Sequence, residues 1–251
     1  MRNRLFSTLF LSSGAAALLV LAGCSARSIS DSGYREEGSY YGRSSGGSYQ
    51  YRGELAETDV VGAPVTNGNI SEADIQRALR GSRQRGTVRA APGSKLVVVQ
   101  SGAATPDSEM LRHLGARYRV QAFSGQPPAE GERANYSKSL RLAAAQGGCD
   151  RILCYWGTLE SAKQDQVTKT VSWVPIAGKL LPDETQQMRI NLHAVLIDVS
   201  TGHWSTYTGK SSENQALSAG LIREYSDQKQ VTQLKAAAYA SLAEELAIRG
   251  T

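Results

Sequence analysis

The three histidines and three cysteines of this 251-residue chain are the side chains best suited to catalysis or metal binding. His113 is expected on a helix, whereas His193 and His203 are expected on the two strands of one hairpin. Around a turn centred near residues 200 and 201, His203 pairs with Asp198, which leaves His193 about five residues away, or roughly 15 to 17 Å. This spacing excludes a metal ion shared by the two histidines, and we expect neither a metal site nor a cofactor.

Two of the cysteines lie close together in sequence. Cys149 and Cys154 flank a junction between a loop and a strand, where an extended path separates them by more than a disulfide spans. A bridge would require Cys149 to fold back. Because Cys154 lies inside an apolar run, we expect buried structural cysteines rather than a nucleophilic thiol.

A hydrolytic triad can be drawn from the same region. Asp198, His203 and Ser205 have the residue types of a serine hydrolase, but such triples arise by chance in a chain of this length. The sequence holds no His-Glu-x-x-His zinc pattern, P-loop or dinucleotide-binding glycine motif. Residues 42–46 (GRSSG) match Gly-x-Ser-x-Gly, but they lie in a Ser/Gly-rich stretch without the strand-to-helix context of a nucleophile elbow. We therefore predict no catalytic residue and expect a protein that is not an enzyme.

The third cysteine, Cys24, follows a signal-peptide pattern. Two arginines precede an apolar run over residues 5–21, which ends in Leu21-Ala22-Gly23-Cys24. This tetrapeptide resembles the lipobox of bacterial lipoproteins. The resemblance implies cleavage after residue 23, a diacylglycerol on the Cys24 thiol and a fatty acyl chain such as palmitate on its amino group. The alternative is an uncleaved membrane anchor, for which the run is short.

Charge and location follow from this N-terminus. Cleavage removes Arg2 and Arg4, so the mature chain is less basic than the +5 of the whole sequence. A weakly basic, exported chain predicts no nucleic-acid partner. By analogy with other lipoproteins, Ser25 in place of Asp favours sorting to the outer membrane, with the protein facing the periplasm.

Composition divides the rest of the chain into two parts. Residues 24–69 are rich in Ser, Gly, Tyr and Arg and predict a lipidated flexible tether. A flexible chain of that length has an end-to-end distance of roughly 35 to 40 Å. Residues 70–251 predict one globular domain, whose ordered structure begins at Ser71 with a capping-box pair to Asp74.

The domain alternates strands and helices in its first half. Strands are expected at 95–101, 117–123, 151–158, 167–174, 187–199 and 204–209, and helices at 71–80, 107–116, 135–146 and 227–249. Residues 151–158 are apolar on both faces and should form a central strand. The order predicts an α/β (α+β) fold, in which helices pack on a single mixed sheet of about five or six strands.

Two segments carry a resemblance to known domains. They are residues 143–153 (AAAQGGCDRIL), a helix that ends into a strand, and residues 194–202 (AVLIDVSTG), a strand that ends in a turn. They resemble the small α/β domain of TolB amino-terminal regions, curli-secretion lipoproteins and lipoproteins that activate penicillin-binding proteins. The chain lacks the long alternating hairpins of the secretion-channel members, so the resemblance does not extend to pore formation.

One apolar segment interrupts the polar second half. Residues 173–183 (WVPIAGKLLPD) contain two prolines and have no period. The segment either folds over the sheet edge or protrudes as a contact for a protein or a membrane. Its candidate partner-binding residues are Trp173, Val174, Ile176, Leu180 and Leu181.

These features favour a non-enzymatic binding or assembly module. The module is expected to be held on the membrane through the lipid on Cys24 and to bind an envelope protein or peptidoglycan. Two alternatives stay open: a periplasmic peptide or cell-wall hydrolase, and a structural envelope component that self-associates through residues 173–183.

Overall fold

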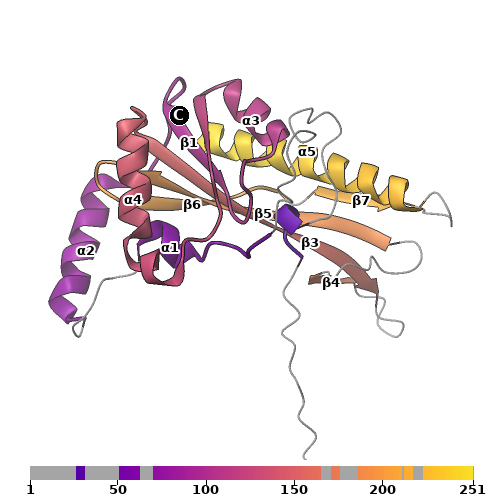
Figure 1. The fold of residues 1–251 in the computed structure, drawn as a ribbon, viewed down its shortest axis with the longest axis horizontal. Helices are drawn as coiled ribbons and strands as arrows, with labels where there is room; N and C mark the ends of the chain where they lie inside the picture. Colours follow the sequence, from indigo (N-terminus) through magenta and orange to yellow (C-terminus); the bar gives the residue numbers. More distant parts are fainter. Residues whose placement is uncertain are drawn as a thin grey trace, which may run out of the picture.

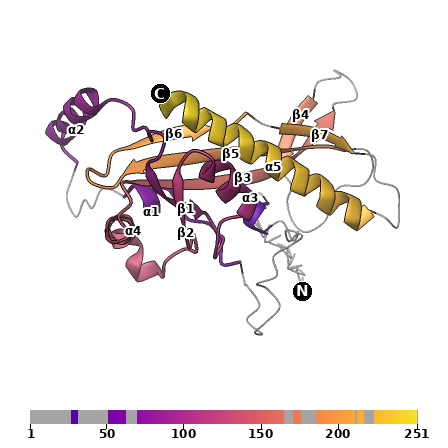
Figure 2. The same ribbon diagram turned by 90° about the horizontal axis from the view of Figure 1, so that it is seen from above.

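The computed structural model describes residues 27–31, 51–62, 70–164, 171–175, 186–210, 212–216 and 223–250. They form one mixed sheet with helices on both faces (Figures 1 and 2), which confirms the expected fold class. The elements are η1 (Ile29–Asp31), α1 (Glu57–Val61), α2 (Glu72–Arg85), β1 (Lys95–Gln100), α3 (Ser108–Gly115), β2 (Arg119–Phe123), η3 (Glu130–Glu132), α4 (Arg133–Gln146), β3 (Arg151–Gln164), β4 (Val171–Pro175), β5 (Gln186–Asp198), β6 (Trp204–Thr208), β7 (Ser212–Ala216) and α5 (Arg223–Gly250).

The sheet combines a parallel and an antiparallel half. Its order is β2-β1-β3-β5-β6, with β4 added to β3 and β7 added to β5. β1 is parallel to β2 and β3, whereas every other pairing is antiparallel. α3 connects β1 to β2, and α4 connects β2 back past β1 to β3. The two right-handed crossovers run in opposite directions across the sheet, so the two helices cover opposite faces.

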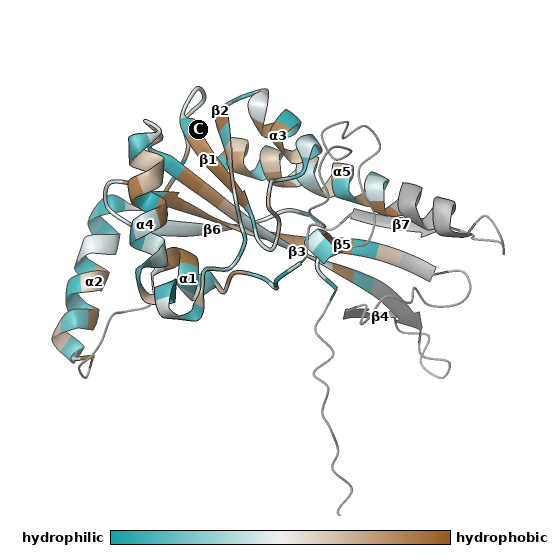
Figure 3. Ribbon diagram, viewed as in Figure 1, coloured by the Kyte–Doolittle hydropathy of each residue, from teal (hydrophilic) through white to brown (hydrophobic). Residues whose placement is uncertain are grey.

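β3 is central, as its apolar composition predicts. It pairs with β5 over eleven residues, from Arg151 opposite Asp198 to Ser161 opposite Met188. Along β5, alternate side chains enter the core that α3 and α5 cover. Their set is Met188, Ile190, Leu192, Ala194 and Leu196. In Figure 3 the hydrophobic colour runs along β1 and the first part of β3, in the middle of the sheet. The alternation along β5 determines which of its faces meets α5.

Each face of the sheet has its own core. On one face, α3 and α5 pack through Met110, Leu114 and an apolar stripe of α5 that includes Leu234, Leu242 and Leu246. On the other face, α4 and α1 cover Val97, Val99, Ile152 and Cys154. The predicted amphipathic pattern of the last helix is therefore confirmed, and both faces of β1 and β3 are buried.

Order does not begin at Ser71, contrary to the sequence-based boundary. Two segments of the predicted tether, residues 27–31 and 51–62, pack on the sheet and bury Ile29, Leu55 and Val60 almost completely. We call them the N-terminal segments. A composition argument misses them because three apolar side chains, each with a specific place in the sheet, leave a Ser/Gly-rich average almost unchanged.

α2 begins as predicted but behaves differently from the other helices. The Ser71 hydroxyl accepts a hydrogen bond from the Asp74 amide, and the Asp74 carboxylate accepts one from the Ser71 amide, which is the expected capping box. The helix continues to Arg85, beyond the expected end near residue 80. None of its residues is buried, and Ile75 and Leu79 are exposed.

The apolar segment 173–183 starts later than expected. Residues 173–175 belong to β4, in which Trp173 pairs with Ala162 and Val174 pairs with Ser161 of β3. Pro175 is the last residue of that strand, where its missing amide hydrogen is tolerated. Ile176, Leu180 and Leu181 lie outside the described residues, so the partner-binding role of this segment stays a prediction.

Candidate functional site

The carboxyl end of β1 carries a buried polar cluster. Gln100 is 1% exposed, and its side-chain oxygen accepts hydrogen bonds from the Tyr155 hydroxyl at 2.6 Å and from the Asp107 amide at 2.7 Å. Its amide nitrogen donates to the Ser30 hydroxyl at 3.1 Å. In open α/β sheets this end of the strands, where crossovers leave in opposite directions, is the usual place for a ligand.

A partly buried ion pair joins this cluster to α5. Lys235 donates to the Asp107 carboxylate at 2.9 Å, and the Tyr239 hydroxyl donates to the same oxygen. The Lys235 side chain is 9% exposed. Tyr239 also meets Tyr155 edge to face, with ring centroids 5.9 Å apart. These groups fix α5 against the loop before α3, because a buried charge is stable only with a partner.

Sequence reasoning missed this cluster. Asp107 and Lys235 are 128 residues apart, and no motif joins them. The signal that was present is the position of Lys235, which directly follows Leu234 in the apolar stripe of α5. A lysine at the margin of a buried stripe indicates an acidic partner on the facing element.

The N-terminal segments fill the crevice above the cluster. The Ser30 hydroxyl donates to the Ser101 carbonyl at 2.6 Å, and the Leu55 amide donates to the Ser101 hydroxyl at 2.9 Å. The Trp156 indole donates to the Leu55 carbonyl at 2.7 Å. Polar groups at this end of the strands would normally bind a ligand. In this protein they form hydrogen bonds with the N-terminal segments instead.

Glu54 belongs to the second N-terminal segment and is partly buried against the first one and the end of β1. The side chains of Ser28 and Ser101 hydrogen bond its carboxyl group. Burial raises the pKa of Glu54 above its usual value, and these two hydrogen bonds offset only part of that rise. A protonated acid is therefore favoured at this position more than at an exposed glutamate.

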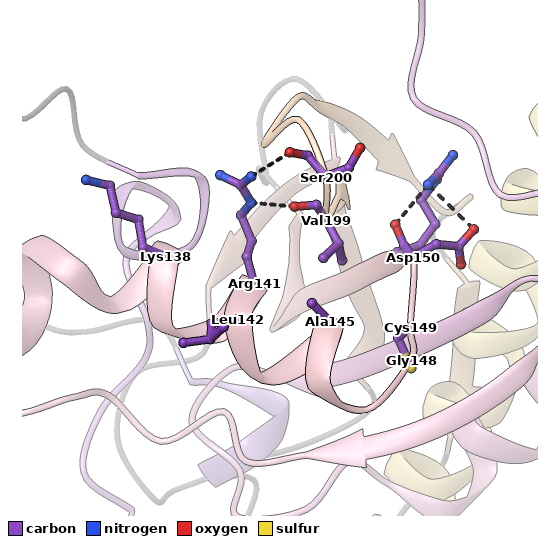
Figure 4. A pocket seen from close by; sticks show the side chains of 10 residues that line it. Lys138, Arg141, Leu142, Ala145, Gly148, Cys149, Asp150, Val199 and Ser200 are labelled. Carbon is purple, nitrogen blue, oxygen red and sulfur yellow. Dashed lines mark hydrogen bonds and ion pairs between the residues drawn. The ribbon is translucent and has the colours of Figure 1, made fainter.

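A hollow opens at the opposite end of β3 (Figure 4). Its volume is about 650 Å³, and it lies between the second half of α4 and the turn after β5. Arg141 closes one side by donating to the carbonyls of Val199 at 2.8 Å and Ser200 at 3.0 Å. Leu142 is 61% exposed beside it. The hollow thus combines a fixed arginine with an uncovered apolar side chain.

The charges around the hollow are mainly positive. Lys138, Arg141 and Arg151 line it against one acid, Asp150. Arg151 forms ion pairs with Asp198 at 2.9 Å and with Asp150 at 3.6 Å, which leaves Lys138 and Arg141 to set the sign of the α4 side. This arrangement suits an acidic ligand with an apolar group.

The three histidines lie in three different places. His113 is 3.3 Å from Glu109 on α3, whereas His193 stacks on Trp156 and is 3.1 Å from Glu57 of α1. The Asp198 amide donates to the His203 carbonyl, which confirms the predicted pairing of these residues. In the described ranges, no cluster of three or more His, Cys, Asp or Glu side chains is placed to hold a metal ion.

The imagined triad is not assembled. The Asp198 carboxylate accepts hydrogen bonds from Ser200 and Thr201 within the turn. Burial raises the pKa of Asp198, but these hydrogen bonds and Arg151 outweigh burial and lower it overall. The Ser205 hydroxyl accepts a hydrogen bond from the Val88 amide at 2.8 Å. Asp198 therefore shapes the turn rather than orienting a histidine.

Cys149 and Cys154 are both buried free thiols, as expected. Cys154 is fully buried, and that burial raises the pKa of its thiol well above the usual value. A thiol with a raised pKa holds less of the reactive thiolate at neutral pH. Cys24, the predicted lipidation site, lies outside the described residues.

A helix that spans a membrane must be both long and predominantly apolar. Among the helices of the described ranges, none is both long enough and apolar enough to cross a bilayer.

Comparison with known proteins gives a family and distant likenesses to solved structures, among them two of PelC. PelC from Paraburkholderia phytofirmans, solved as a dodecamer, and a variant of it with one substitution are each 18% identical to this chain. They cover 63% of this chain and 93% and 94% of their own chains, at a TM-score of 0.29. This likeness is too distant to bear on function, and the sequence matches none of the curated proteins to which it was compared.

The family assignment rests on the folded part described above. A family model described as YafT bacterial lipoprotein matches residues 56–249, from the start of α1 to the end of α5. The match includes both crossover units, the β3–β5 pair and the terminal helix, although it begins after the first N-terminal segment. On this evidence the chain belongs to the YafT family of bacterial lipoproteins.

Proposed function

We propose that this lipoprotein is anchored in the outer membrane through a lipid on Cys24 and faces the periplasm. There it acts as a non-enzymatic binding module for an acidic segment of an envelope protein. Membership of a bacterial lipoprotein family and the Leu21-Ala22-Gly23-Cys24 sequence support the anchor. Ser25 after the lipidated cysteine supports the outer membrane, and the resemblance to lipoprotein domains that dock on envelope partners supports the binding role.

One observation carries the proposal: the crevice at the carboxyl end of β1 is filled by the protein itself. Ser30 and Leu55 take the hydrogen bonds of Ser101, so a small substrate entering there would have to displace both N-terminal segments. A module of this kind binds through its surface. The hollow beside α4 offers that surface, since it is open, positively charged and flanked by exposed Leu142.

The test is crosslinking in intact cells. A photoreactive amino acid replaces Leu142 in the full chain, and Ile248 on α5 serves as the matched control because it is 63% exposed against 61% for Leu142. We expect a discrete crosslinked envelope protein from position 142 and none from position 248. Lys138→Glu should reduce that crosslink several-fold, and added salt should reduce it too, because rim charges mainly steer association.

Three results would count against the proposal. Equal crosslinking at both positions indicates nonspecific proximity. A crosslink that is insensitive to Lys138→Glu would show that the positive charge of the hollow does not contribute to binding. Crosslinks to peptidoglycan sacculi in place of a protein would replace the proposed partner with a cell-wall polymer.

A further inference from the structure

We propose that the folded domain is held directly at the surface of the bilayer that carries its lipid. The point of attachment is the first N-terminal segment, residues 27–31. The inference rests on the lipidation of Cys24, which belongs to the proposed function, and goes beyond it by fixing where the domain lies. It replaces the expected reach of a long tether with contact at the headgroup region.

The first N-terminal segment is a built part of the sheet. Ser28 forms an antiparallel bridge with Thr158, and the Leu159 amide donates to the Arg27 carbonyl at 3.0 Å. β3 continues beyond the end of β1, because Gln100, the last residue of β1, is opposite Tyr155. The Ser28 bridge and the Arg27 carbonyl therefore lie on the part of β3 that β1 leaves uncovered.

Packing holds the same segment in place. Ile29 is 1% exposed and belongs to the core between the sheet and α5. Gly157 makes room for it, since a Cβ added there would lie 2.7 Å from the Ile29 side chain. Ser30 adds a hydrogen bond to the Ser101 carbonyl. A buried isoleucine with a backbone pairing beside it resists removal, because undocking would return its apolar side chain to water.

The second N-terminal segment returns to the same point. A Cβ added at Gly102 would lie 2.8 Å from the Tyr51 ring, 3.1 Å from the Gly53 carbonyl and 3.3 Å from the Ser30 Cβ. The Ser/Gly/Tyr-rich residues 32–50 therefore connect two neighbouring positions on the domain. They do not lie between the lipid and the sheet, so their length adds nothing to the reach of the domain.

Chain length then limits the distance from the bilayer. Cys24 and Arg27 are three residues apart. A fully extended chain of three residues spans at most about 11 Å. The lipid on Cys24 therefore keeps Arg27, the first residue of the docked segment, within about that distance of the headgroups, against the roughly 35 to 40 Å expected of a flexible tether of 45 residues.

The same limit orients the hollow beside α4. The hollow lies at the amino end of β3, near Lys95 at the start of β1, because the Asp150 amide donates to the Lys95 carbonyl. The six residues of β1 separate that end from Ser101, which is about 20 Å at the rise of a strand. The attachment point stays at the bilayer, and the length of β1 allows the hollow to lie up to about 20 Å farther from it.

The experiment measures distance from the bilayer at two positions. The full lipidated protein is placed in nanodiscs that contain phosphatidylcholine with a spin-labelled headgroup, which quenches a fluorophore at short range. One fluorophore is attached at Ala104→Cys, two residues after Gly102, and the control at Gln146→Cys beside the hollow. Both positions are exposed. We expect several-fold stronger quenching at position 104.

A flexible spacer distinguishes docked N-terminal segments from a free tether. About twenty Gly and Ser residues inserted between Ala26 and Arg27 leave the domain unchanged but add roughly 25 Å of r.m.s. reach. We expect quenching at position 104 to fall to the level of position 146. If the N-terminal segments were not docked, the lipid and the folded domain would already be joined by a flexible tether of about 45 residues, and the spacer would change the quenching little. Equal quenching at both positions, or no effect of the spacer, would overturn the inference.

Failure of the anchor has a different signature. Partition of the protein into the membrane fraction, with Cys24→Ala as the unlipidated control, is measured before the quenching experiment. A protein that stays soluble overturns the anchor and this inference together. A membrane-bound protein without preferential quenching at position 104 overturns the inference alone and leaves the proposed binding role to the crosslinking test.

Discussion

At the scale of single residues, Gly125 holds the loop after β2 against the end of β1. Its amide donates to the Ala103 carbonyl and its carbonyl accepts from the Gly102 amide. A Cβ at this position would lie 1.9 Å from the Gln100 carbonyl oxygen, which is backbone. Only glycine fits here, and its lack of a side chain allows the loop after β2 to pack directly on the backbone at the end of β1.

Gly125→Ala should therefore destabilise the fold by about 1–3 kcal/mol, the usual cost of overpacking a tight site. The measurement is the free energy of unfolding in urea. Gly131→Ala is the matched control, since nothing lies within 4 Å of a Cβ there, and its effect should stay within about 0.5 kcal/mol. Equal effects of the two changes would contradict this account of the crevice.

Glu54 predicts a pH dependence at the same place. Because its pKa is raised in the folded protein, folding favours the protonated acid, so its contribution is most favourable below the unfolded pKa and declines as pH rises through the folded pKa. Glu54→Gln should therefore be more stable than the parent near pH 7, and the gain should shrink toward about pH 4. Urea midpoints against pH measure it, with exposed Glu130→Gln as control. A gain independent of pH would exclude the buried acid as its cause.

Single residues were predictable where the evidence was local. The pairing of His203 with Asp198 follows from one turn, and the burial of Cys154 follows from one apolar run. The Asp107, Lys235 and Tyr239 cluster was not predictable, because its members meet only after α5 has packed on the sheet. Contacts across more than a hundred residues leave no periodic trace in a sequence.

At the scale of elements, α5 depends on one polar contact within an apolar face. Lys235→Met keeps the aliphatic length but leaves Asp107 with Tyr239 as its remaining partner on α5. We expect a loss of about 1–3 kcal/mol in the free energy of unfolding, the range for removing a hydrogen bond to a charged group, because the partly buried Asp107 carboxylate loses its cationic partner. Lys138→Met on the exposed side of α4 should change it by less than about 0.5 kcal/mol. Similar values for both would show that Lys235 contributes only packing.

α2 should respond locally. Ser71→Ala removes the hydroxyl of the capping box and costs about 1 kcal/mol, equivalent to about fivefold faster amide exchange over residues 72–85. Because no residue of α2 is buried, global unfolding should hardly change. Hydrogen exchange measured by mass spectrometry reads both, and Ser82→Ala within the same helix should not increase exchange. A drop in global stability would mean that α2 is coupled to the core.

Elements were predictable where their period was long. β5 alternates over thirteen residues and α5 repeats its apolar stripe over several turns, so both were found from sequence. β7 and the N-terminal segments were missed. Five residues of β7 with the composition Ser-Glu-Asn-Gln-Ala carry no strand signal, and β7 exists because β5 extends far enough to pair with it.

At the scale of the whole molecule, the folded unit is larger than composition indicates. A chain that begins at Ile70 lacks Ile29, Leu55 and Val60, whose exposed fractions are 2% or less. Each such side chain contributes about 1.5–3 kcal/mol, so this chain should be markedly less stable in urea than one that begins at Arg27, or should aggregate. Equal unfolding midpoints would show that the N-terminal segments are not part of the cooperative unit.

Docking of the first N-terminal segment also has a consequence in time. Ser30 meets Ser101 across 71 residues, and Leu55 meets Trp156 across 101. Chains are made and exported from the amino end, so the part that lies beside the proposed lipidation site emerges first and finds its place in the sheet among the last. Under the proposed function, cleavage and acylation at Cys24 therefore fall within that interval, before residues 27–31 dock on the sheet.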